Sequence, residues 1–425
     1  MKKPRVFIGL REVAGYFSNL NKGFEEIGLD SAFLNLGGNP FNYDLGTNPK
    51  WVTALNFIGA KFGAKFGKNF ILRAIWLLIF QNIFSFFAFL IAVFRYDIFI
   101  FGSHSTFFFF LDYIVLKLLG KKIICVYLGS DTRPVFLNGY AFTGNGNIRA
   151  LRLITKCQKL VINISELFSD ISINHPPFGQ FHKKEFFKHL SLGIPTLVPS
   201  IKVKSERNKK IKIIHCPSKA LPKGSHLFAE IIKRLKFKYD IEYIKASGIP
   251  HREVLNLIAT ADIALDEFYS DTPLAVFASE CASLKVPVVV GSYYTIEIKN
   301  DYDEKKLPPS AFVHPSEIEK TIEGLIVDKA KRKKLGEEAF RFIQNNWSPA
   351  DVAKRYIKLI NNDYPNEWRY NPKNNKYLYG CGLSEEQLSI NLKKFSKGKK
   401  GLNAFFLKDK PLINDEYFKI INEKK

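Results

Sequence analysis

Residues 213–225 read IIHCPSKALPKGS, and this stretch is the most informative part of the chain. The apolar run at 211–215 predicts a β-strand, and two prolines and a glycine mark the loop after it. Lys219 and Lys223 therefore follow the carboxyl end of a strand, where open α/β sheets bind ligands. Gly224 lets the backbone approach such a ligand closely. We expect an anion-binding loop here, in which Lys223 matters more than Lys219.

A second anion site is predicted at 272–280. Thr272 and Pro273 have the residue types of a helix N-cap and first helical residue, and a helix start presents free N–H groups to an anion. Glu280 would then lie eight residues along that helix, about 12 Å from its start. Its neighbours are small and apolar, so its carboxylate needs either a bound ligand or a local donor. His215, at the end of the strand, fits a ligand contact and a buried, hydrogen-bonded histidine equally well.

Four stretches in order carry a resemblance to a known family: 213–225, ASGIPHREV at 246–254, ADIALD at 261–266 and ASECASLKVPVVVG at 278–291. Together they resemble the donor-binding domain of the retaining GT-B glycosyltransferases, of the family 4 or group 1 type. The resemblance implies a nucleotide-sugar donor as substrate, with no other cofactor and no metal requirement. Such a donor carries a diphosphate and a ribose diol. From the chemistry described above, we expect Lys219, Lys223, Gly224 and Thr272 near the diphosphate and Glu280 on the ribose.

The acceptor side is marked by GSDTR at 129–133, after another predicted strand. This element resembles the His-Gly-Ser-Asp-x-Arg motif of some GT-B transferases, but Leu128 stands where the histidine would be. His104, after the neighbouring strand, can replace that histidine as a sugar contact. Asp131 is expected to orient an acceptor hydroxyl, and Arg133 to contact an acceptor or donor phosphate. The alternative is that Asp131 and Arg133 pair with each other and fix the loop.

A second departure concerns the family's Glu-x7-Glu motif, whose first glutamate is replaced here by Thr272. This replacement leaves three alternatives. Asp271, beside Thr272, takes over the contact to the sugar hydroxyl, or the enzyme uses an unusual donor, or the activity is lost. The resemblance implies no clear protein nucleophile, so we assign no general base. Asp131 and Asp271 are the catalytic candidates, acting through positioning and electrostatics. Gly15, in the first strand–helix loop, joins His104 and Arg133 as an acceptor or sugar contact.

Alternating strand and helix patterns predict an α/β fold. We expect a GT-B architecture, in which two Rossmann-like, doubly wound parallel-sheet domains face a cleft and a C-terminal extension follows. The expected divisions are an acceptor-side domain at 1–198, a donor-binding domain with a crossover helix at 199–363, and the extension at 364–425. Predicted strands are 5–9, 32–36, 98–101, 122–127 and 160–164, then 211–215, 241–245, 262–265 and 286–290.

Composition limits the remaining possibilities. The 425 residues include 46% hydrophobic ones, which excludes a disordered chain, and 63 Lys and Arg against 40 acidic residues give a net charge of +23. Such a surplus indicates polyanionic partners. The five cysteines have neither metal-ligand nor disulfide spacing, which indicates a reducing compartment. No signal-peptide pattern precedes the first strand, so a cytoplasmic location is expected.

Residues 74–94 are uncharged, and Lys61, Lys65 and Lys68 alternate with phenylalanines just before them. A single membrane crossing here would split the first sheet, so we expect a helix lying on an anionic bilayer. The alternative is an ordinary core helix beside a solvated basic loop.

The expected function is transfer of a sugar to a glycan or lipid-linked glycan, in lipopolysaccharide or capsule synthesis at the inner face of the membrane. One alternative is a non-catalytic GT-B-like binding or scaffold protein. A nucleic-acid-binding protein is disfavoured because its usual motifs are missing from the sequence, so we expect no nucleic-acid partner.

Overall fold

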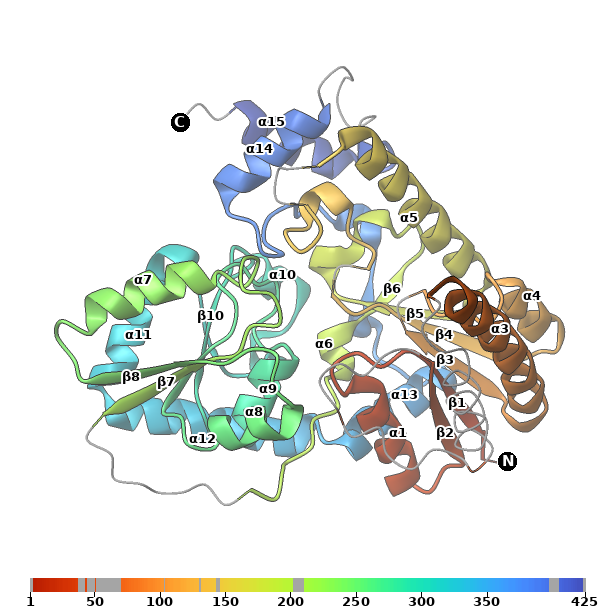
Figure 1. The fold of residues 1–425 in the computed structure, drawn as a ribbon, viewed down its shortest axis with the longest axis horizontal. Coiled ribbons are helices and arrows are strands. Elements are labelled where there is room, and N and C mark those ends of the chain that lie inside the picture. The colour runs from red at the N-terminus through yellow and green to blue at the C-terminus, as the bar shows by residue number, and fades with distance from the viewer. Residues whose placement is uncertain are drawn as a thin grey trace.

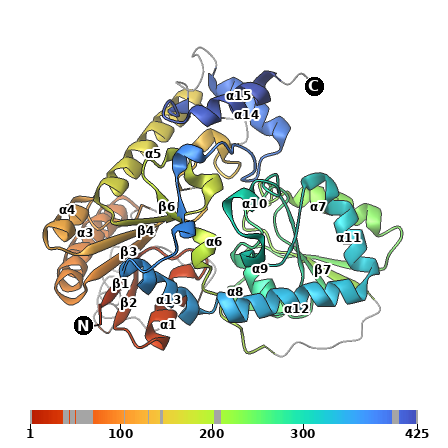
Figure 2. The same cartoon turned by 180° about the vertical axis from the view of Figure 1, so that it is seen from behind.

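The computed structural model describes residues 3–36, 43, 50, 70–102, 104–129, 131–142, 146–201, 210–396 and 405–422, and for 70–82 it describes only the helical backbone. Two sheets of different size, each flanked by helices, lie side by side (Figure 1). The last helices of the chain lie beside the first sheet's domain and reach toward the second (Figure 2). The predicted fold class, two parallel-sheet α/β domains with a C-terminal extension, is confirmed.

The first sheet has the order β12-β6-β5-β4-β3-β1-β2, and every pair in it is parallel except β12 with β6. Its strands are β1 (Val6–Leu10), β2 (Ser31–Asn35), β3 (Ile98–Gly102), β4 (Lys122–Val126), β5 (Ile171–Asn174) and β6 (Phe186–Lys188). Its helical segments are α1 (Tyr16–Glu26), α3 (Phe70–Arg95), α4 (Leu111–Leu118), η1 (Val135–Leu137), α5 (Ile148–Phe168), η2 (Pro176–Phe181) and α6 (His189–Leu192).

Alternate side chains of these strands enter two different cores, as the period of two in a strand requires. Phe7 and Phe99 pack with α3, α4 and part of α5 on one face. Ile8 and Ile100 pack with α1 on the other face, together with α13 from the far end of the second domain. That second core continues without interruption into the second domain, so the two domains share buried apolar surface.

The second sheet is parallel, with the order β11-β10-β9-β7-β8. Its strands are β7 (Ile211–His215), β8 (Ile241–Lys245), β9 (Ile263–Leu265), β10 (Val288–Gly291) and β11 (Ala311–Val313). Its helical segments are α7 (Ser225–Leu235), α8 (His251–Ile258), α9 (Val276–Ser283), α10 (Ile298–Asp301), η3 (Glu304–Lys306), η4 (Pro315–Glu317), α11 (Ile318–Val327), α12 (Lys329–Asn346) and α13 (Pro349–Ile360). Helix α13 returns to the first domain, where the Tyr356 hydroxyl meets that of Tyr16 at 2.9 Å.

The C-terminal extension is structured and belongs to the first domain. It contains η5 (Asn366–Trp368), β12 (Arg369–Tyr370), η6 (Pro372–Asn374), α14 (Glu385–Ser396) and α15 (Pro411–Asn422). Strand β12 pairs with β6 at the sheet edge, and α14 and α15 enclose a third apolar core with η1 and α5.

One predicted strand is wrong. Residues 160–164 lie inside the long helix α5, and the strand expected there is β5, about ten residues later. The uncharged segment 74–94 is helical, as predicted, within α3. In the part of the chain that the structure describes, no helix has the length and apolarity needed to cross a membrane. Lys61, Lys65 and Lys68 lie outside the described residues.

Candidate functional site

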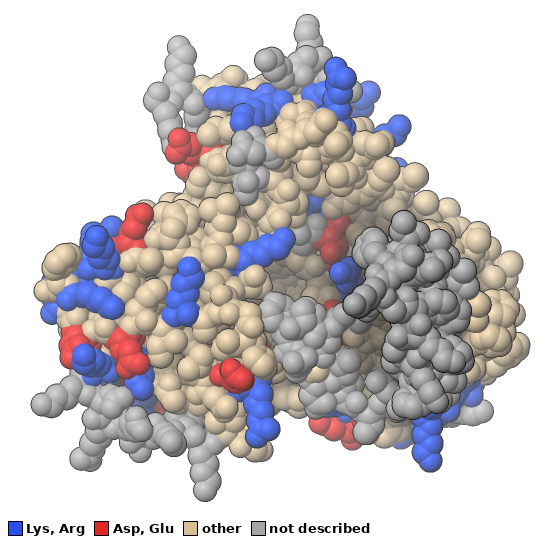
Figure 3. All heavy atoms as spheres, viewed as in Figure 1, with Lys and Arg blue, Asp and Glu red and all other residues tan. Residues whose placement is uncertain are grey.

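The carboxyl ends of the two sheets face each other, and the loops that leave them meet. The surface is hollowed between the domains, with acidic and basic side chains visible in the hollow (Figure 3). Tyr140, from the first domain, donates to Glu267 Oε1 of the second at 2.7 Å. His175, just after β5, contacts the Asp271 carbonyl oxygen at 2.7 Å. This junction is where ligands bind in folds of this kind.

Lys223 lies within this junction but is already paired. Its Nζ is 2.6 Å from Asp266 Oδ1 and 3.0 Å from Glu267 Oε1. Burial alone would lower the pKa of Lys223, but the two carboxylates outweigh it and raise the pKa above its usual value. A diphosphate would have to compete with two carboxylates for this ammonium group.

Lys219 is placed differently. Its side chain is exposed, and Nζ donates to the Tyr140 carbonyl oxygen across the domain junction at 3.3 Å. A neutral carbonyl is a weaker partner for an ammonium group than a carboxylate. Lys219 is therefore the less strongly paired of the two lysines, although the sequence-based prediction gave Lys223 the larger role in anion binding.

Gly224 and His215 both have structural roles here. Gly224 has a φ of 69° as the N-cap of α7, and a Cβ there would overlap Phe268, so its close approach is to protein. His215 Nδ1 donates to the Leu265 carbonyl at 2.8 Å, and Nε2 accepts from the Ser225 hydroxyl at 2.8 Å. Burial lowers the pKa of His215 to about 4, so it is a neutral, hydrogen-bonded core histidine.

The predicted start of the glutamate helix is wrong. Helix α9 begins at Val276, with Ala275 as its N-cap, so Thr272 and Pro273 lie before it. Tertiary contacts hold these residues in an extended turn, since Ser310 Oγ donates to the Pro273 carbonyl at 2.7 Å. Ala275 has no side chain that can cap the helix, which leaves the first N–H groups of α9 for another acceptor.

Glu280 is therefore the fifth residue of α9, about 6 Å along its axis at ~1.5 Å per residue. Its Oε1 is 2.7 Å from His251 Nε2, and 12% of its side chain remains exposed. Burial raises the pKa of Glu280, and His251 opposes that shift. The ring of Tyr43 stacks on His251 with centroids 4.2 Å apart, so a first-domain residue covers this pair from across the junction.

Arg133 and Asp271 form a fully buried ion pair at the junction of the two domains. Arg133 Nη1 is 3.0 Å from Asp271 Oδ2, and both side chains have 0% exposure. Arg133 also donates to the carbonyl oxygens of Leu137, Pro177, Leu378 and Tyr379. Burial raises the pKa of Asp271 to about 7, although Arg133 acts in the opposite direction. The pair joins both domains and the extension.

A loop of the extension closes over this pair. The Gly382 N–H donates to the Tyr269 carbonyl at 3.0 Å, and the Gly139 N–H donates to the Cys381 carbonyl at 2.9 Å. A Cβ at Gly380 would collide with the Asp271 carboxylate. Neither Arg133 nor Asp271 can thus touch a ligand unless the 378–382 segment moves, although sequence reasoning placed both in the site.

The remaining predicted residues lie on first-domain loops. Asp131 Oδ2 accepts from the Leu128 N–H at 3.0 Å, and the Asp131 carbonyl contacts His104 Nε2 at 3.1 Å. The carboxylate therefore shapes its own loop, and it pairs with Leu128 rather than with Arg133. Gly15 is the N-cap of α1 with a φ of 81°, and a Cβ there would press on the Tyr43 ring.

Sequence reasoning missed two histidines. His175 is buried and neutral, because burial lowers its pKa to about 3. It donates from Nε2 to the Asp271 carbonyl and accepts from the Tyr302 hydroxyl at 2.9 Å on Nδ1. His251 opens α8, inside the 246–254 stretch that carries the family resemblance. Its place in that stretch could have marked His251 as a candidate site residue. No local sequence feature indicates that Glu280 is its partner.

No family model matches the sequence, and no curated protein matches it. Solved structures that align with this fold include HepE (Alr3699) of Anabaena in complex with UDP, at 10% identity and a TM-score of 0.47, over 84% of this chain and 100% of that one. The glycosyltransferase SnogD of Streptomyces nogalater aligns at 12% identity and a TM-score of 0.41, over 84% of this chain and 100% of that one. A mutant of S. aureus TarM, in complex with fondaparinux, alpha-GlcNAc-glycerol and UDP, aligns at 10% identity and a TM-score of 0.38, over 62% of this chain and 55% of that one.

Proposed function

We propose that the protein is a glycosyltransferase that uses a nucleotide-sugar donor, bound by the second domain. The observation that carries the proposal is Glu280, a carboxylate near the start of α9 that one histidine holds at the junction of two parallel sheets. A carboxylate so held can accept two hydrogen bonds from a ribose diol. Its raised pKa means that its burial is costly, and that hydrogen bonds from a ligand would offset part of this cost.

The diphosphate would lie between Glu280 and the first domain. The uncapped N-terminus of α9 supplies N–H groups and the positive end of a helix dipole. Lys219 would supply an exposed ammonium group from the loop after β7. Lys223 would act indirectly, because it holds Asp266 and Glu267 in place beneath that loop.

Catalysis would rest on stabilising the departing diphosphate with these same groups. The loop that Asp131 shapes leads to Arg133, whose ion pair with Asp271 lies in the junction. This loop would position the acceptor hydroxyl, together with His104, which contacts the Asp131 carbonyl oxygen, and Gly15, which lies against Tyr43. A retaining outcome, and the absence of a metal or cofactor requirement, remain proposals that follow the family resemblance. Asp271 has no role in this scheme while Arg133 and Gly380 enclose it.

We further propose a glycan or lipid-linked acceptor, in cell-surface polysaccharide synthesis at the inner face of the membrane. Peripheral association with anionic lipid is the corresponding partner proposal, and no nucleic-acid partner is expected. The surplus of 23 positive charges supports a polyanionic surface as one partner.

A non-catalytic relative is the second candidate, and the enclosure of Asp271 and Arg133 favours it. Such a protein would bind a nucleotide sugar without turning it over.

The two candidates are separated by measuring binding and turnover together. A thermal-shift screen against UDP-, GDP-, CMP- and ADP-linked sugars should find one donor that raises Tm by mass action. Release of nucleoside diphosphate from that donor would establish an enzyme, whereas stabilisation without release favours the binding protein. If no nucleotide sugar stabilises the chain, the donor site is refuted.

A further inference from the structure

Two neighbouring helices of the first domain turn apolar side chains outward. On α3, the exposed positions include Ile83, Phe86, Phe87 and Phe94. On α4, they are Leu111, Ile114, Val115 and Leu118. Scattered exposed apolar residues are normal on a protein surface, but a contiguous group of them marks a contact surface.

The spacing of these residues shows that they form stripes. Positions 83, 86 and 87 on α3, and 111, 114, 115 and 118 on α4, follow the i, i+3, i+4, i+7 pattern of one helix face. In most helices that pattern marks the buried side. Here the buried side is a second stripe, with Tyr113 and Leu116 facing the sheet on α4. Helix α4 is thus apolar on both sides.

The two outward stripes face the same direction. Both helices pack on the same face of the first sheet, so their outer sides point away from it together. The loop before α4 joins them, because Phe108 packs against Phe86 with ring centroids 6.3 Å apart. Phe109 beside it is 90% exposed. We call the exposed apolar residues of 83–94 and 109–119 the outer apolar face.

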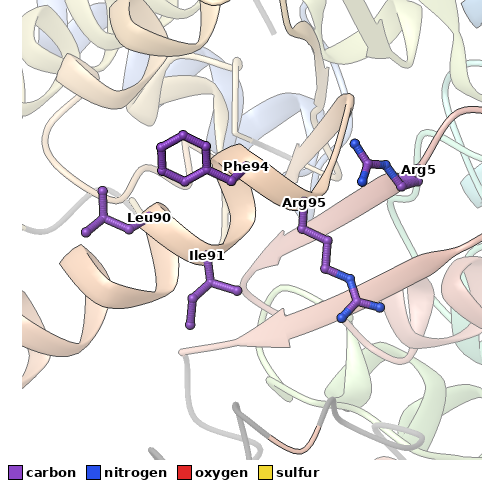
Figure 4. Close-up of a pocket in the computed structure, with 5 residues that line it drawn as sticks. All are labelled: Arg5, Leu90, Ile91, Phe94 and Arg95. Carbon is purple, nitrogen blue, oxygen red and sulfur yellow. The ribbon is translucent and has the colours of Figure 1, made fainter.

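A shallow pocket of 540 Å³ adjoins this face at the end of α3, lined by Leu90, Ile91, Phe94, Arg95 and Arg5 (Figure 4). It combines apolar side chains with two guanidinium groups. Cations gather around this amino-terminal edge of the sheet, and four of the five named next pair with an exposed or half-buried carboxylate there. The cations are Lys3, Arg5, Arg95, Lys117 and Lys121, and the carboxylates are Asp30, Asp97 and Asp170.

We propose that the outer apolar face docks on an anionic lipid bilayer, with the pocket and its arginines meeting a lipid phosphate. Apolar side chains at this density favour the boundary between headgroups and acyl chains, and the cationic edge favours anionic headgroups. A second copy of the chain fits this face less well than a bilayer does, because the cationic edges of the two copies would repel each other. The inference deepens the membrane association proposed above and does not depend on the donor site.

Docking in this way orients the catalytic junction. The helices cover one face of the first sheet, whereas the junction lies at the carboxyl ends of its strands. The bilayer would therefore lie beside the junction, roughly parallel to the sheet. An acceptor anchored in the bilayer would enter the junction from the side of the first domain that carries α3 and α4.

Vesicle flotation tests the proposal with the full-length protein and no donor. Vesicles of equal parts phosphatidylcholine and phosphatidylglycerol should bind the wild type, and pure phosphatidylcholine should bind it more weakly. Phe109→Asp/Leu118→Asp, in the loop before α4 and in α4 itself, and Phe86→Ser/Phe87→Ser on α3 should each lower partitioning at least about tenfold. The control is Phe237→Asp, which changes a side chain 83% exposed on the second domain and should bind as the wild type does.

The charged part has its own pair of variants. Arg95→Gln should weaken binding to anionic vesicles, whereas Lys333→Gln, exposed on α12, should not. A wild type that stays with the unbound fraction, or α3 and α4 variants that float as well as it does, would overturn the proposal. So would a concentration-dependent dimer in light scattering that the α4 variant abolishes without any lipid binding. Donor stabilisation is measured without vesicles, so a failure of either proposal is seen separately.

Discussion

Asp271 and Glu280 lie nine residues apart in the chain, and both were candidate site residues, but they have different surroundings. Asp271 faces a permanent cation, Arg133, in a fully enclosed position. Glu280 faces an imidazole, His251, and keeps part of its surface accessible. The comparison shows that burial and charge pairing alone do not identify a ligand site. A carboxylate can serve a ligand only when its partner leaves some of its hydrogen-bonding capacity accessible.

The largest effect should come from breaking the enclosed pair. Arg133→Ala leaves Asp271 without its cation and removes four further donations to backbone carbonyls. We expect a loss of about 3–5 kcal/mol in the free energy of unfolding, measured by urea denaturation. Arg234→Ala removes an exposed pair with Glu319 and should cost about 0–1 kcal/mol. Equal losses in the two variants would show that the Arg133 pair contributes no more to stability than an exposed ion pair does.

The enclosed carboxylate should also leave a signature in the pH dependence. Burial raises the pKa of Asp271 to about 7 from its usual 3.8, so the folded state holds its proton longer than the unfolded state. The associated stability is complete below pH 3.8 and is lost as pH rises toward 7. The wild type should lose about 2–4 kcal/mol relative to Asp271→Asn across this window. Parallel stability curves for the two proteins would contradict the shift.

Glu280 should respond in binding rather than in stability. Glu280→Gln keeps the shape but loses charge-assisted acceptance, worth about 1.5–3 kcal/mol. Donor affinity, measured by calorimetry, should fall at least about tenfold while the melting temperature changes little. Asp271→Asn provides the matched comparison and should leave donor affinity unchanged. Wild-type affinity in Glu280→Gln would remove Glu280 from the site.

The smallest expected effect concerns the two lysines. Lys219→Ala should weaken nucleoside diphosphate binding by about 1 kcal/mol, because an exposed ammonium group makes a partly screened contact. Lys223→Ala should instead lower stability, since it leaves Asp266 and Glu267 without their shared cation. If only Lys223→Ala weakens diphosphate binding at full stability, the order expected from the sequence is restored.

The regular parts of the fold were predictable from short patterns. Strands 211–215 and 241–245 were placed correctly because apolar runs bounded by loop residues leave few alternatives. Residues 160–164 misled because LVINI has the β-branched composition of a strand. They continue a 21-residue helix whose buried positions include Thr155 and Ile162, seven residues apart. Helical spacing prevails there over local propensity.

The site was less predictable, because its geometry depends on contacts between distant segments. Thr272 and Pro273 have good local signals for a helix start, but the preceding residue pairs with Arg133, 138 positions away. Closure of that pair by the 378–382 loop depends on a C-terminal segment without a diagnostic motif. The sequence predicted that the Glu280 carboxylate needs a partner. The fold shows that this partner is His251.

The return of α13 and β12 to the first domain has a consequence for how the chain is made. Tyr16 on α1 meets Tyr356, and the edge of β6 pairs with Arg369 and Tyr370. The first domain therefore lacks these two parts, as well as α14 and α15, when its own residues leave the ribosome. At ~5–20 residues per second, about 10–30 s pass before α13 follows the end of that domain. During this interval one core face and one strand edge stay open, and both are aggregation-prone surfaces. We therefore expect the first domain to complete its fold late, after nearly the whole protein has been translated.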